Sequence, residues 1–477
     1  MVFSSDTFLF FFLPVCVLVY ALIRREARNA WLLAMSLLFY AWGGGAFLLW
    51  LLGSIGVNWV LGLVAERAAR DGKAWTTRLA IGFSAAVNML LLGWFKYANF
   101  VVEQLTGIAP GWEIEWERVT LPIGISFFTF QALSYVIDVA RGGARALKNP
   151  MDFALYVSLF PQLIAGPIVR YHEIASQMRQ RSFTLDGVTS GLVRFAHGLC
   201  KKVLVADSAG LIADTVFNEA GGPATSADAW IGMFAYTVQI YFDFSGYSDM
   251  AIGLGRVFGF TIPENFKRPY SATSMTDFWR RWHVTLSSWF RDYVYIPLGG
   301  SRSGTLKTYR NLVIVFLATG IWHGAAWTFV LWGVYHGAWL VIERLRRGLK
   351  PTDEEPVGFA LFRARAFTLL LVMIGWVLFR ANGVDAAGQH YLALLGTRGW
   401  EMGGALALEM SRQAWAALAV GAVICVAPGG MSWGRALDER VGPLMATARL
   451  LLVCVLLPAA IAQVLAGTFS PFLYFRF

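Results

Sequence analysis

The sequence predicts an all-α integral membrane protein that crosses the bilayer many times. Hydrophobic residues make up 57% of the 477 residues and charged residues only 15%, whereas soluble domains carry about 25% charged residues. Clean apolar runs recur along the chain, at residues 7–23, 31–52, 79–95, 229–240, 312–342, 366–379, 414–428 and 450–466. A spanning helix needs about 20 mostly apolar residues, and several runs are short enough to stop midway or re-enter. We therefore expect about 10–12 transmembrane or re-entrant helices.

The first apolar run is expected to stay as a membrane anchor rather than to be removed as a signal peptide. No positive residue precedes it, and Arg24, Arg25 and Arg28 follow it. Other basic clusters also fall in short loops after apolar runs, whereas the segment 103–117 is acidic. The positive-inside rule then places the N-terminus outside the cytoplasm. Because these loops account for the net charge of +10, no nucleic acid partner is expected.

The composition is even enough to predict one domain over residues 1–477. Within it we distinguish N-terminal spans (1–150), a core with re-entrant and interfacial helices (151–345) and C-terminal spans (346–477). In the core, prolines and glycines interrupt the apolar runs, and His197, Lys201 and Lys202 interrupt another. Polar backbone at membrane depth is tolerated only inside protein or around a water-filled cavity. The core is therefore expected to line a cavity.

Two histidines lie in the otherwise uncharged apolar run 321–337. Because an intramembrane histidine is costly unless it is used or paired, His323 and His336 are candidates for function. On one continuous helix, 13 residues would place them about 20 Å apart and on different faces. A break at Gly324 or Gly333 would bring them closer. No spacing typical of a metal site is present, so no metal is expected; a buried histidine that only bonds across helices is an equally good reading of the pattern.

A second unusual segment, residues 239–250, ends an apolar run with two carboxylates, Asp243 and Asp249. Tyr241 and Ser245 lie in the same segment. Carboxylates at such a position usually pair with cations or line an aqueous vestibule. Arginines of the segment 276–293 are plausible partners, and a structural ion pair is at least as good an explanation as a catalytic role.

Residues 276–293 show a helical pattern of aromatic side chains opposite arginines, typical of a helix in the membrane interface. Its arginines are Arg280, Arg281 and Arg291, and His283 lies between the two faces. The chain has no GxSxG or Walker A motif. A neutral imidazole could act as general base on a hydroxyl that attacks a thioester, or form a transient acyl-imidazole. The alternative is a proton-coupled transporter or polysaccharide-export channel, with His323 and Asp243 as proton relay.

The runs 321–337, 239–250 and 277–300 resemble those of membrane-bound O-acyltransferases. The opening Met-Val-Phe-Ser-Ser and the ending Phe-Leu-Tyr-Phe-Arg-Phe are similar to the bacterial alginate O-acetyltransferase-like branch. The resemblance implies a ring of helices around a central tunnel in the bacterial inner membrane, with a periplasmic N-terminus. It implies that His323 is the principal catalytic histidine, His283 the second, and His336 a supporting residue.

The resemblance also implies the substrates and partners of such an enzyme. The acetyl group would come from cytoplasmic acetyl-CoA or from a carrier-protein thioester, with no bound cofactor. A periplasmic or membrane-anchored acetyltransferase would complete its transfer to an exopolysaccharide. From the residues themselves we predict that Arg280, Arg281 and Arg291 bind the donor's phosphates, although contact with membrane lipid headgroups would explain them equally well. Trp322 and Trp327 are expected to keep bulk water from His323.

Overall fold

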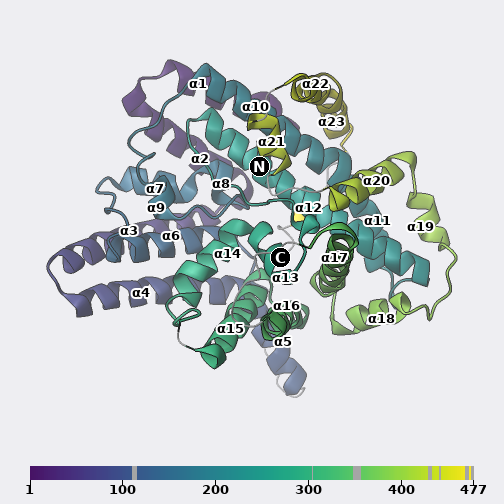
Figure 1. Ribbon diagram of the computed structural model, residues 1–477. Coiled ribbons are helices and arrows are strands. Elements are labelled where there is room, and N and C mark those ends of the chain that lie inside the picture. The colour runs from purple at the N-terminus through teal and green to yellow at the C-terminus, as the bar shows by residue number, and fades with distance from the viewer. Residues whose placement is uncertain are drawn as a thin grey trace. The chain divides into compact units, whose positions relative to one another are not determined.

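The computed structural model describes residues 1–109, 115–302, 304–347, 356–427, 432–439, 442–467 and 472–473. In this part of the chain all regular secondary structure is helical and no strand occurs (Figure 1). The all-α prediction is therefore confirmed. The backbone packs into two compact units: unit 1 comprises Met1–Phe195 and Met250–Pro263, and unit 2 comprises Ala196–Asp249 and Glu264–Phe477. The single domain predicted for residues 1–477 stays a prediction.

Unit 1 contains the N-terminal helices. They are α1 (Leu13–Leu22), α2 (Arg28–Gly44), α3 (Phe47–Arg70), α4 (Ala74–Leu92), α5 (Ala98–Ile108), α6 (Ile125–Ala140), α7 (Pro150–Ser158), α8 (Phe160–Leu163), α9 (Tyr171–Ile174) and most of α10 (Leu185–Cys200). Short π-helical turns at Phe8–Phe12 and Gly93–Tyr97 extend α1 backwards and join α4 to α5, and a 3-10 turn at Arg25–Ala27 joins α1 to α2. These turns let long apolar segments continue as helix while changing which face points inward.

The core of unit 1 is aromatic. Phe8 packs against Phe39 with ring centroids 5.9 Å apart, and Phe12 packs edge-on against Phe160 at 5.4 Å. These side chains come from the first helix, α2 and α8, so three segments far apart in sequence share one cluster. Offset and edge-to-face ring pairs of this kind add to the free energy gained by burying the rings. The cluster fixes the N-terminal segment within unit 1.

Unit 2 contains the helices that carry most of the predicted site. They are α11 (Asp207–Phe217), α12 (Ser226–Val257, whose last turns belong to unit 1), α13 (Met275–Arg281), α14 (Val284–Phe290), α15 (Thr305–His323), α16 (Trp327–Arg347), α17 (Gly358–Arg380), α18 (Val384–Leu394), α19 (Gly404–Glu409), α20 (Arg412–Val426), α21 (Trp433–Glu439), α22 (Pro443–Leu451) and α23 (Leu457–Leu465). π-helical turns at Lys201–Ala206, Arg291–Tyr295 and Leu452–Leu456 connect several of them.

Four helical segments are long and apolar enough to cross a membrane. They are Phe47–Arg70, Ala74–Ile108, Gly358–Arg380 and Pro443–Leu465, and three shorter apolar helices cover Phe8–Leu22, Ile125–Ala140 and Arg412–Cys425. The span Pro443–Leu465 is only 11% buried, as expected for a helix that faces lipid. These helices agree with a membrane protein. The number of 10–12 spanning or re-entrant helices and the central tunnel stay predictions.

Candidate active site

The apolar run that contains His323 and His336 folds as a helical hairpin rather than one helix. α15 ends at His323, Gly324 is extended (φ −168°, ψ 160°), and α16 begins at Trp327. The two helices approach closely because Gly320 and Gly333 face each other; a Cβ on Gly320 would collide with the carbonyl oxygen of Phe329. Small residues permit such backbone contact between membrane helices. Of the two glycines at which a break would bring the histidines closer, Gly324 is therefore the one where the helix is interrupted.

The break places both histidines of the hairpin against Trp332. The His323 ring centroid lies 5.2 Å from that of Trp332, and the His336 centroid lies 4.7 Å from it on the same indole. Phe379 of α17 packs edge-on against His323 at 4.9 Å. His323 is only 3% exposed. The hairpin therefore brings together two imidazoles that a continuous helix would separate.

His336 lies in an aromatic cage. It is fully buried, and its neighbours include Trp279 at 5.1 Å and Trp376 at 6.4 Å. Its Nε2 faces Gly375 of α17, where a Cβ would lie 2.8 Å from that nitrogen. Neither ring nitrogen has a hydrogen-bond partner among the described residues. These surroundings are therefore those of a histidine that packs against aromatic rings in the protein interior.

His283 lies where the helix expected over 276–293 is broken. α13 ends at Arg281, and His283 adopts a left-handed conformation (φ 43°, ψ 53°) before α14 begins. Asn265 stabilises the break, because its backbone carbonyl accepts the Val284 N–H at 2.9 Å and its side-chain oxygen accepts the Thr285 N–H at 3.2 Å. The expectation of one continuous helix was wrong: Asn265 replaces hydrogen bonds that the helix would have made itself.

The same asparagine determines the tautomer of His283. The Asn265 atom near the imidazole must be the oxygen, since it accepts the backbone N–H of Thr285, and an amide oxygen can only accept. His283 Nδ1 lies 3.1 Å from this oxygen and therefore carries the proton. Nε2 is then the nitrogen with the lone pair. His283 lies outside the candidate spanning helices, and burial lowers its pKa to about 3, so the imidazole is neutral near pH 7.

One tryptophan, Trp322, packs against both His283 and His323. The Trp322 ring centroid is 6.1 Å from that of His283 and 4.9 Å from that of His323. Trp322 is buried, as expected for a residue that excludes water. Trp327 begins α16 and is 53% exposed; its role in keeping water from His323 stays a prediction.

The two carboxylates of α12 pair with lysines. Asp243 Oδ1 lies 2.8 Å from Lys202 Nζ, and Asp249 Oδ2 lies 2.9 Å from Lys201 Nζ and 3.2 Å from His197 Nδ1. All of these groups except His197 are buried. The arginines of segment 276–293 were therefore the wrong partners. The correct partners lie in the polar segment before residue 205, which was noted in the sequence but not connected to the aspartates.

Tyr241 and Ser245, the other two residues predicted from segment 239–250, also lie on α12 and are buried. Ser245 is 2% exposed, and its Oγ has no hydrogen-bond partner among the described residues. Tyr241 packs against Trp282 with centroids 6.2 Å apart, next to His283 in the chain. α12 therefore contributes Tyr241, Ser245 and the two paired carboxylates to the interior that surrounds the histidines.

A segment near the C-terminus also enters this interior. The Leu473 N–H donates to Asp243 Oδ2 at 2.7 Å, and the Phe472 ring lies 6.0 Å from that of Phe244. Phe244 in turn packs edge-on against His283 at 4.7 Å. Phe472 and Leu473, two residues of the C-terminal motif, thus contact side chains of α12, one of which packs against His283. Residues 474–477 of that motif lie outside the described residues.

The three predicted donor-binding arginines differ in their partners. Arg281 Nε lies 2.7 Å from Asp277 Oδ1, and Arg291 Nε lies 2.7 Å from Asp292 Oδ1. Arg280 is exposed and forms no ion pair with a carboxylate of the described residues. No group of three or more His, Cys, Asp or Glu residues in the described ranges could hold a metal ion.

Unit 2 also contains a mostly apolar cavity of about 300 Å³ with a cationic edge. Its polar lining comes from His197, Lys201, Tyr241 and Arg268, and α20–α22 supply apolar side chains. Arg268 has a left-handed backbone (φ 50°, ψ 63°), and its guanidinium carbon lies 3.8 Å from the Trp433 ring centroid. Sequence reasoning missed Arg268, Asn265 and this cavity, because nothing local distinguishes them.

The described residues thus form a helical membrane protein whose interior contains buried imidazoles and lysine–aspartate pairs. The chain belongs to the MBOAT, or membrane-bound O-acyltransferase, family, whose pattern it matches over residues 127–369. The match includes α12 to α16 and the break between α13 and α14, and therefore His283, His323 and both aspartates.

Full-length relatives share this family. The chain is 41% identical to the probable alginate O-acetylase AlgI of Azotobacter vinelandii and 42% identical to that of Pseudomonas putida, with all of both chains covered in each case. It is also 37% identical to the peptidoglycan O-acetyltransferase of Helicobacter pylori, over 84% of this chain and 80% of that protein. The family and these similarities agree with an enzyme and not with a transporter.

Proposed function

We propose that this protein transfers an acetyl group from a cytoplasmic thioester donor across the inner membrane for O-acetylation of an exported, alginate-like polysaccharide. The observation that carries the proposal is the pair of buried histidines, His323 and His283, which both pack against Trp322. The names of the relatives support both the acetyl group and a cell-envelope polymer as acceptor. The N-terminus would lie in the periplasm.

In the proposed step, a hydroxyl oxygen attacks the carbonyl carbon of the acetyl thioester. A neutral imidazole accepts the hydroxyl proton, the carbon–sulfur bond breaks, and the thiolate leaves and takes up a proton. His323 is the principal base or acyl acceptor. His283 is the second histidine, with Nε2 as the basic nitrogen because Nδ1–H donates to Asn265. The aromatic rings around both histidines exclude water that would otherwise hydrolyse the thioester.

The donor and the partners form part of the same proposal. Acetyl-CoA or a carrier-protein thioester is the donor, and Arg280, Arg281 and Arg291 bind its phosphates. Arg280 is the most available of the three, because the other two each pair with a carboxylate. A periplasmic or membrane-anchored acetyltransferase then completes the transfer to the polymer. His336, Trp322, Tyr241, Asp243, Ser245 and Asp249 support the site by packing and by ion pairing.

The test uses the purified full-length protein in nanodiscs with radiolabelled acetyl-CoA. Wild type is expected to release labelled acetate or to become labelled, and His323→Gln to lose this activity by about 10⁴-fold while staying folded. His390→Gln is the matched control, since His390 is also buried in unit 2 but stacks on Phe217 at 4.4 Å. Retained turnover in His323→Gln would remove the catalytic assignment. Intact acetyl transfer with loss of polymer export would instead favour the transporter.

A further inference from the structure

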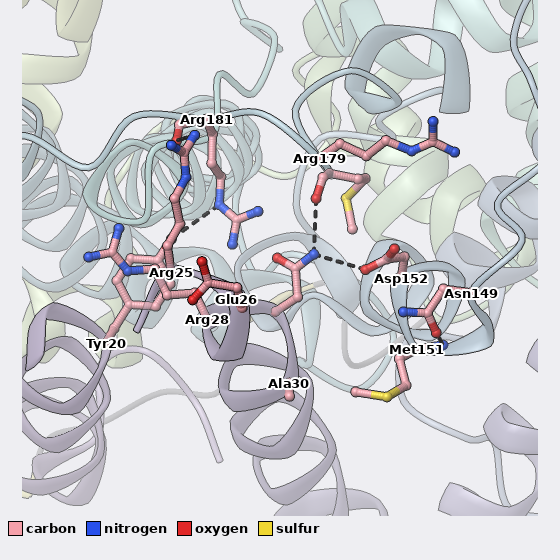
Figure 2. Close-up of a pocket in the computed structure, with 12 residues that line it drawn as sticks. Tyr20, Arg25, Glu26, Arg28, Ala30, Asn149, Met151, Asp152, Arg179 and Arg181 are labelled. Atoms are coloured by element: carbon pink, nitrogen blue, oxygen red, sulfur yellow. Dashed lines mark hydrogen bonds between the residues drawn. The ribbon is translucent and has the colours of Figure 1, made fainter. Parts of the chain in front are cut away.

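Unit 1 contains an open, polar cavity of about 450 Å³ for which acetyl transfer gives no role (Figure 2). Four arginines line it, and they come from two separate segments: Arg25 and Arg28 join α1 to α2, and Arg179 and Arg181 follow α9. A neighbouring cavity of about 460 Å³ shares Arg25, Arg28 and Arg181. We refer to these three residues as the arginine cluster.

Aromatic rings hold Arg28 in the cluster. Its guanidinium carbon lies 5.0 Å from the Tyr20 ring centroid and 5.1 Å from that of Phe183. Its Nε is buried and has no hydrogen-bond partner among the described residues. Stacking on rings fixes the plane of a guanidinium but leaves its N–H edge available for an acceptor. Arg28 is therefore preorganised to bind an anion.

Hydrogen bonds hold the other two members of the cluster. Arg181 Nε donates to Tyr20 Oη at 3.1 Å and to the Phe258 carbonyl oxygen at 3.2 Å. Arg25 Nη2 donates to the carbonyl oxygen of Arg181 at 3.4 Å. Figure 2 shows Tyr20 and the three arginines together at one side of the view. The cluster is thus one assembled group, in which Tyr20 contacts both Arg28 and Arg181.

The charge of the cavity of about 450 Å³ is not balanced by the carboxylates that line it. Four arginines and two carboxylates, Glu26 and Asp152, line it, which leaves a formal charge of +2. Within the described residues, none of the four arginines forms an ion pair, whereas Asp152 accepts a hydrogen bond from Asn29 Nδ2 at 2.9 Å. Arginine forks match the oxygens of a phosphate ester, with charge-assisted hydrogen bonds. A phosphate is therefore the ligand chemistry that this lining fits.

The source of the phosphate follows from the neighbouring helix. α1 exposes large apolar side chains, with Leu18 61% and Leu22 77% exposed, and the arginine cluster begins three residues after its end. In a membrane protein such an apolar face contacts acyl chains, so the end of the helix lies at headgroup level. A ligand with a phosphate at the cluster and apolar chains along α1 satisfies both surfaces.

We propose that the arginine cluster is a binding site for the phosphate of an anionic phospholipid, whose acyl chains lie along the exposed face of α1. The guanidinium groups of Arg28 and Arg181 contact the phosphate oxygens, and Arg25 closes the outer side. The site is independent of the acetyl-transfer proposal, because it lies in unit 1 and uses none of the residues assigned to that reaction.

The test is native mass spectrometry of the full-length protein in detergent, titrated with phosphatidylglycerol or with phosphatidylcholine of the same acyl chains. Wild type is expected to bind phosphatidylglycerol about tenfold more tightly, and Arg28→Gln to lose about tenfold in that affinity. Arg25→Gln, at an exposed residue whose side chain forms one long hydrogen bond to the described residues, is expected to lose about threefold without unfolding. Arg24→Gln is the matched control, since this exposed arginine of the same link lines neither cavity.

Three results would overturn the proposal. Equal affinity for the two lipids would show that the cluster does not select an anionic headgroup. Equal losses in Arg24→Gln and Arg28→Gln would mean that the basic loop acts only through its total charge. Displacement of phosphatidylglycerol by free CoA, with saturable CoA binding that Arg28→Gln weakens, would assign the site to a soluble phosphate ester instead. Measured acetyl transfer can stay normal in each of these cases, so the two proposals fail separately.

Discussion

The two units bury polar side chains in different ways. In unit 1, α3 and α4 share a neutral network in which Ser84 Oγ and Asn88 Nδ2 donate to Asn58 Oδ1 at 2.6 and 2.9 Å. In unit 2, buried lysines pair with buried aspartates, as in the contact between Lys202 and Asp243, whereas the charged groups that unit 1 buries are fewer and include Asp138 and Arg194. Neutral hydrogen bonds tie helices together with a small desolvation penalty, whereas buried charges are costly and suit a site that needs them.

Backbone strain follows the same division. Arg268 and His283 are the non-glycine residues with positive φ in the described part of the chain, and both lie in unit 2. In unit 1, positive φ values within the described ranges occur at glycines such as Gly124, where they cost little. Strained residues persist where surrounding contacts impose them, typically at functional sites. The strained non-glycine residues and the buried lysine–aspartate pairs thus both fall in unit 2, which contains the proposed catalytic histidines.

The largest effect that would sharpen this comparison is expected at a buried lysine. Lys202 Nζ contacts Asp207 at 2.6 Å and Asp243 at 2.8 Å, so Lys202→Met leaves two carboxylates uncompensated. We expect the free energy of unfolding to fall by about 3–5 kcal/mol. Thermal unfolding in detergent measures this. Lys73→Met in unit 1, at an exposed lysine 3.9 Å from Asp71, should change stability by less than about 0.5 kcal/mol. Similar effects at both lysines would contradict the division between the units.

The sequence predicted the type of secondary structure better than it predicted the tertiary contacts that each side chain makes. Apolar composition was enough for an all-α membrane protein, whereas the sequence named Gly324 and Gly333 as possible break points without deciding whether or where the helix ends. The helix 226–257 extends well beyond its apolar run, because Asp243 and Asp249 are paired with lysines and do not end it. Such pairing depends on tertiary contacts and leaves no local pattern.

The candidate site was predictable residue by residue but not as an arrangement. His323 could be chosen because a histidine in an apolar run is unusual, and Trp322 because it precedes His323. His283 was chosen from its place between the two faces of segment 276–293 and from the resemblance to the family. Asn265 could not, since it lies in a loop with no periodicity and acts only through His283 and Thr285. The left-handed backbone of His283 was hidden for the same reason: the aromatic pattern around it continues through the break.

A smaller effect is expected from removing the residue that positions His283. Asn265→Ala should lower kcat by about 10²-fold, because the imidazole loses its orientation and tautomer. Asn265→Asp tests this role more sharply. A carboxylate beside Nδ1 raises the pKa of His283 from about 3, so activity should be lost at a higher pH as the solution is acidified. The pH profile of kcat/KM measures this shift; an unchanged acidic limb would show that His283 does not act as a base.

A mutation in the neutral hydrogen-bond network of unit 1 should lower the free energy of unfolding without changing turnover. Asn58→Ala leaves the Ser84 hydroxyl and the Asn88 amide with fewer partners, and we expect the free energy of unfolding to fall by about 1–2 kcal/mol. Turnover per folded molecule should stay at the wild-type value. Thermal unfolding and labelled-acetate release on the same sample measure both. A loss of kcat with unchanged stability would place catalytic chemistry in unit 1.

The smallest effect is expected at the donor arginine with no ion pair. Arg280→Gln should raise the apparent KM for acetyl-CoA by about threefold to tenfold with little change in kcat, because a phosphate contact far from the reacting carbon binds ground state and transition state alike. Arg78→Gln, at an exposed arginine of unit 1, is the matched control and should leave both constants unchanged. Steady-state kinetics in nanodiscs of fixed lipid composition separate this effect from lipid binding.

If kcat falls while KM is constant, Arg280 acts on the histidines rather than on the donor. If both arginines raise KM equally, the effect is one of surface charge, and the donor site must be sought at the cationic edge formed by Lys201 and Arg268.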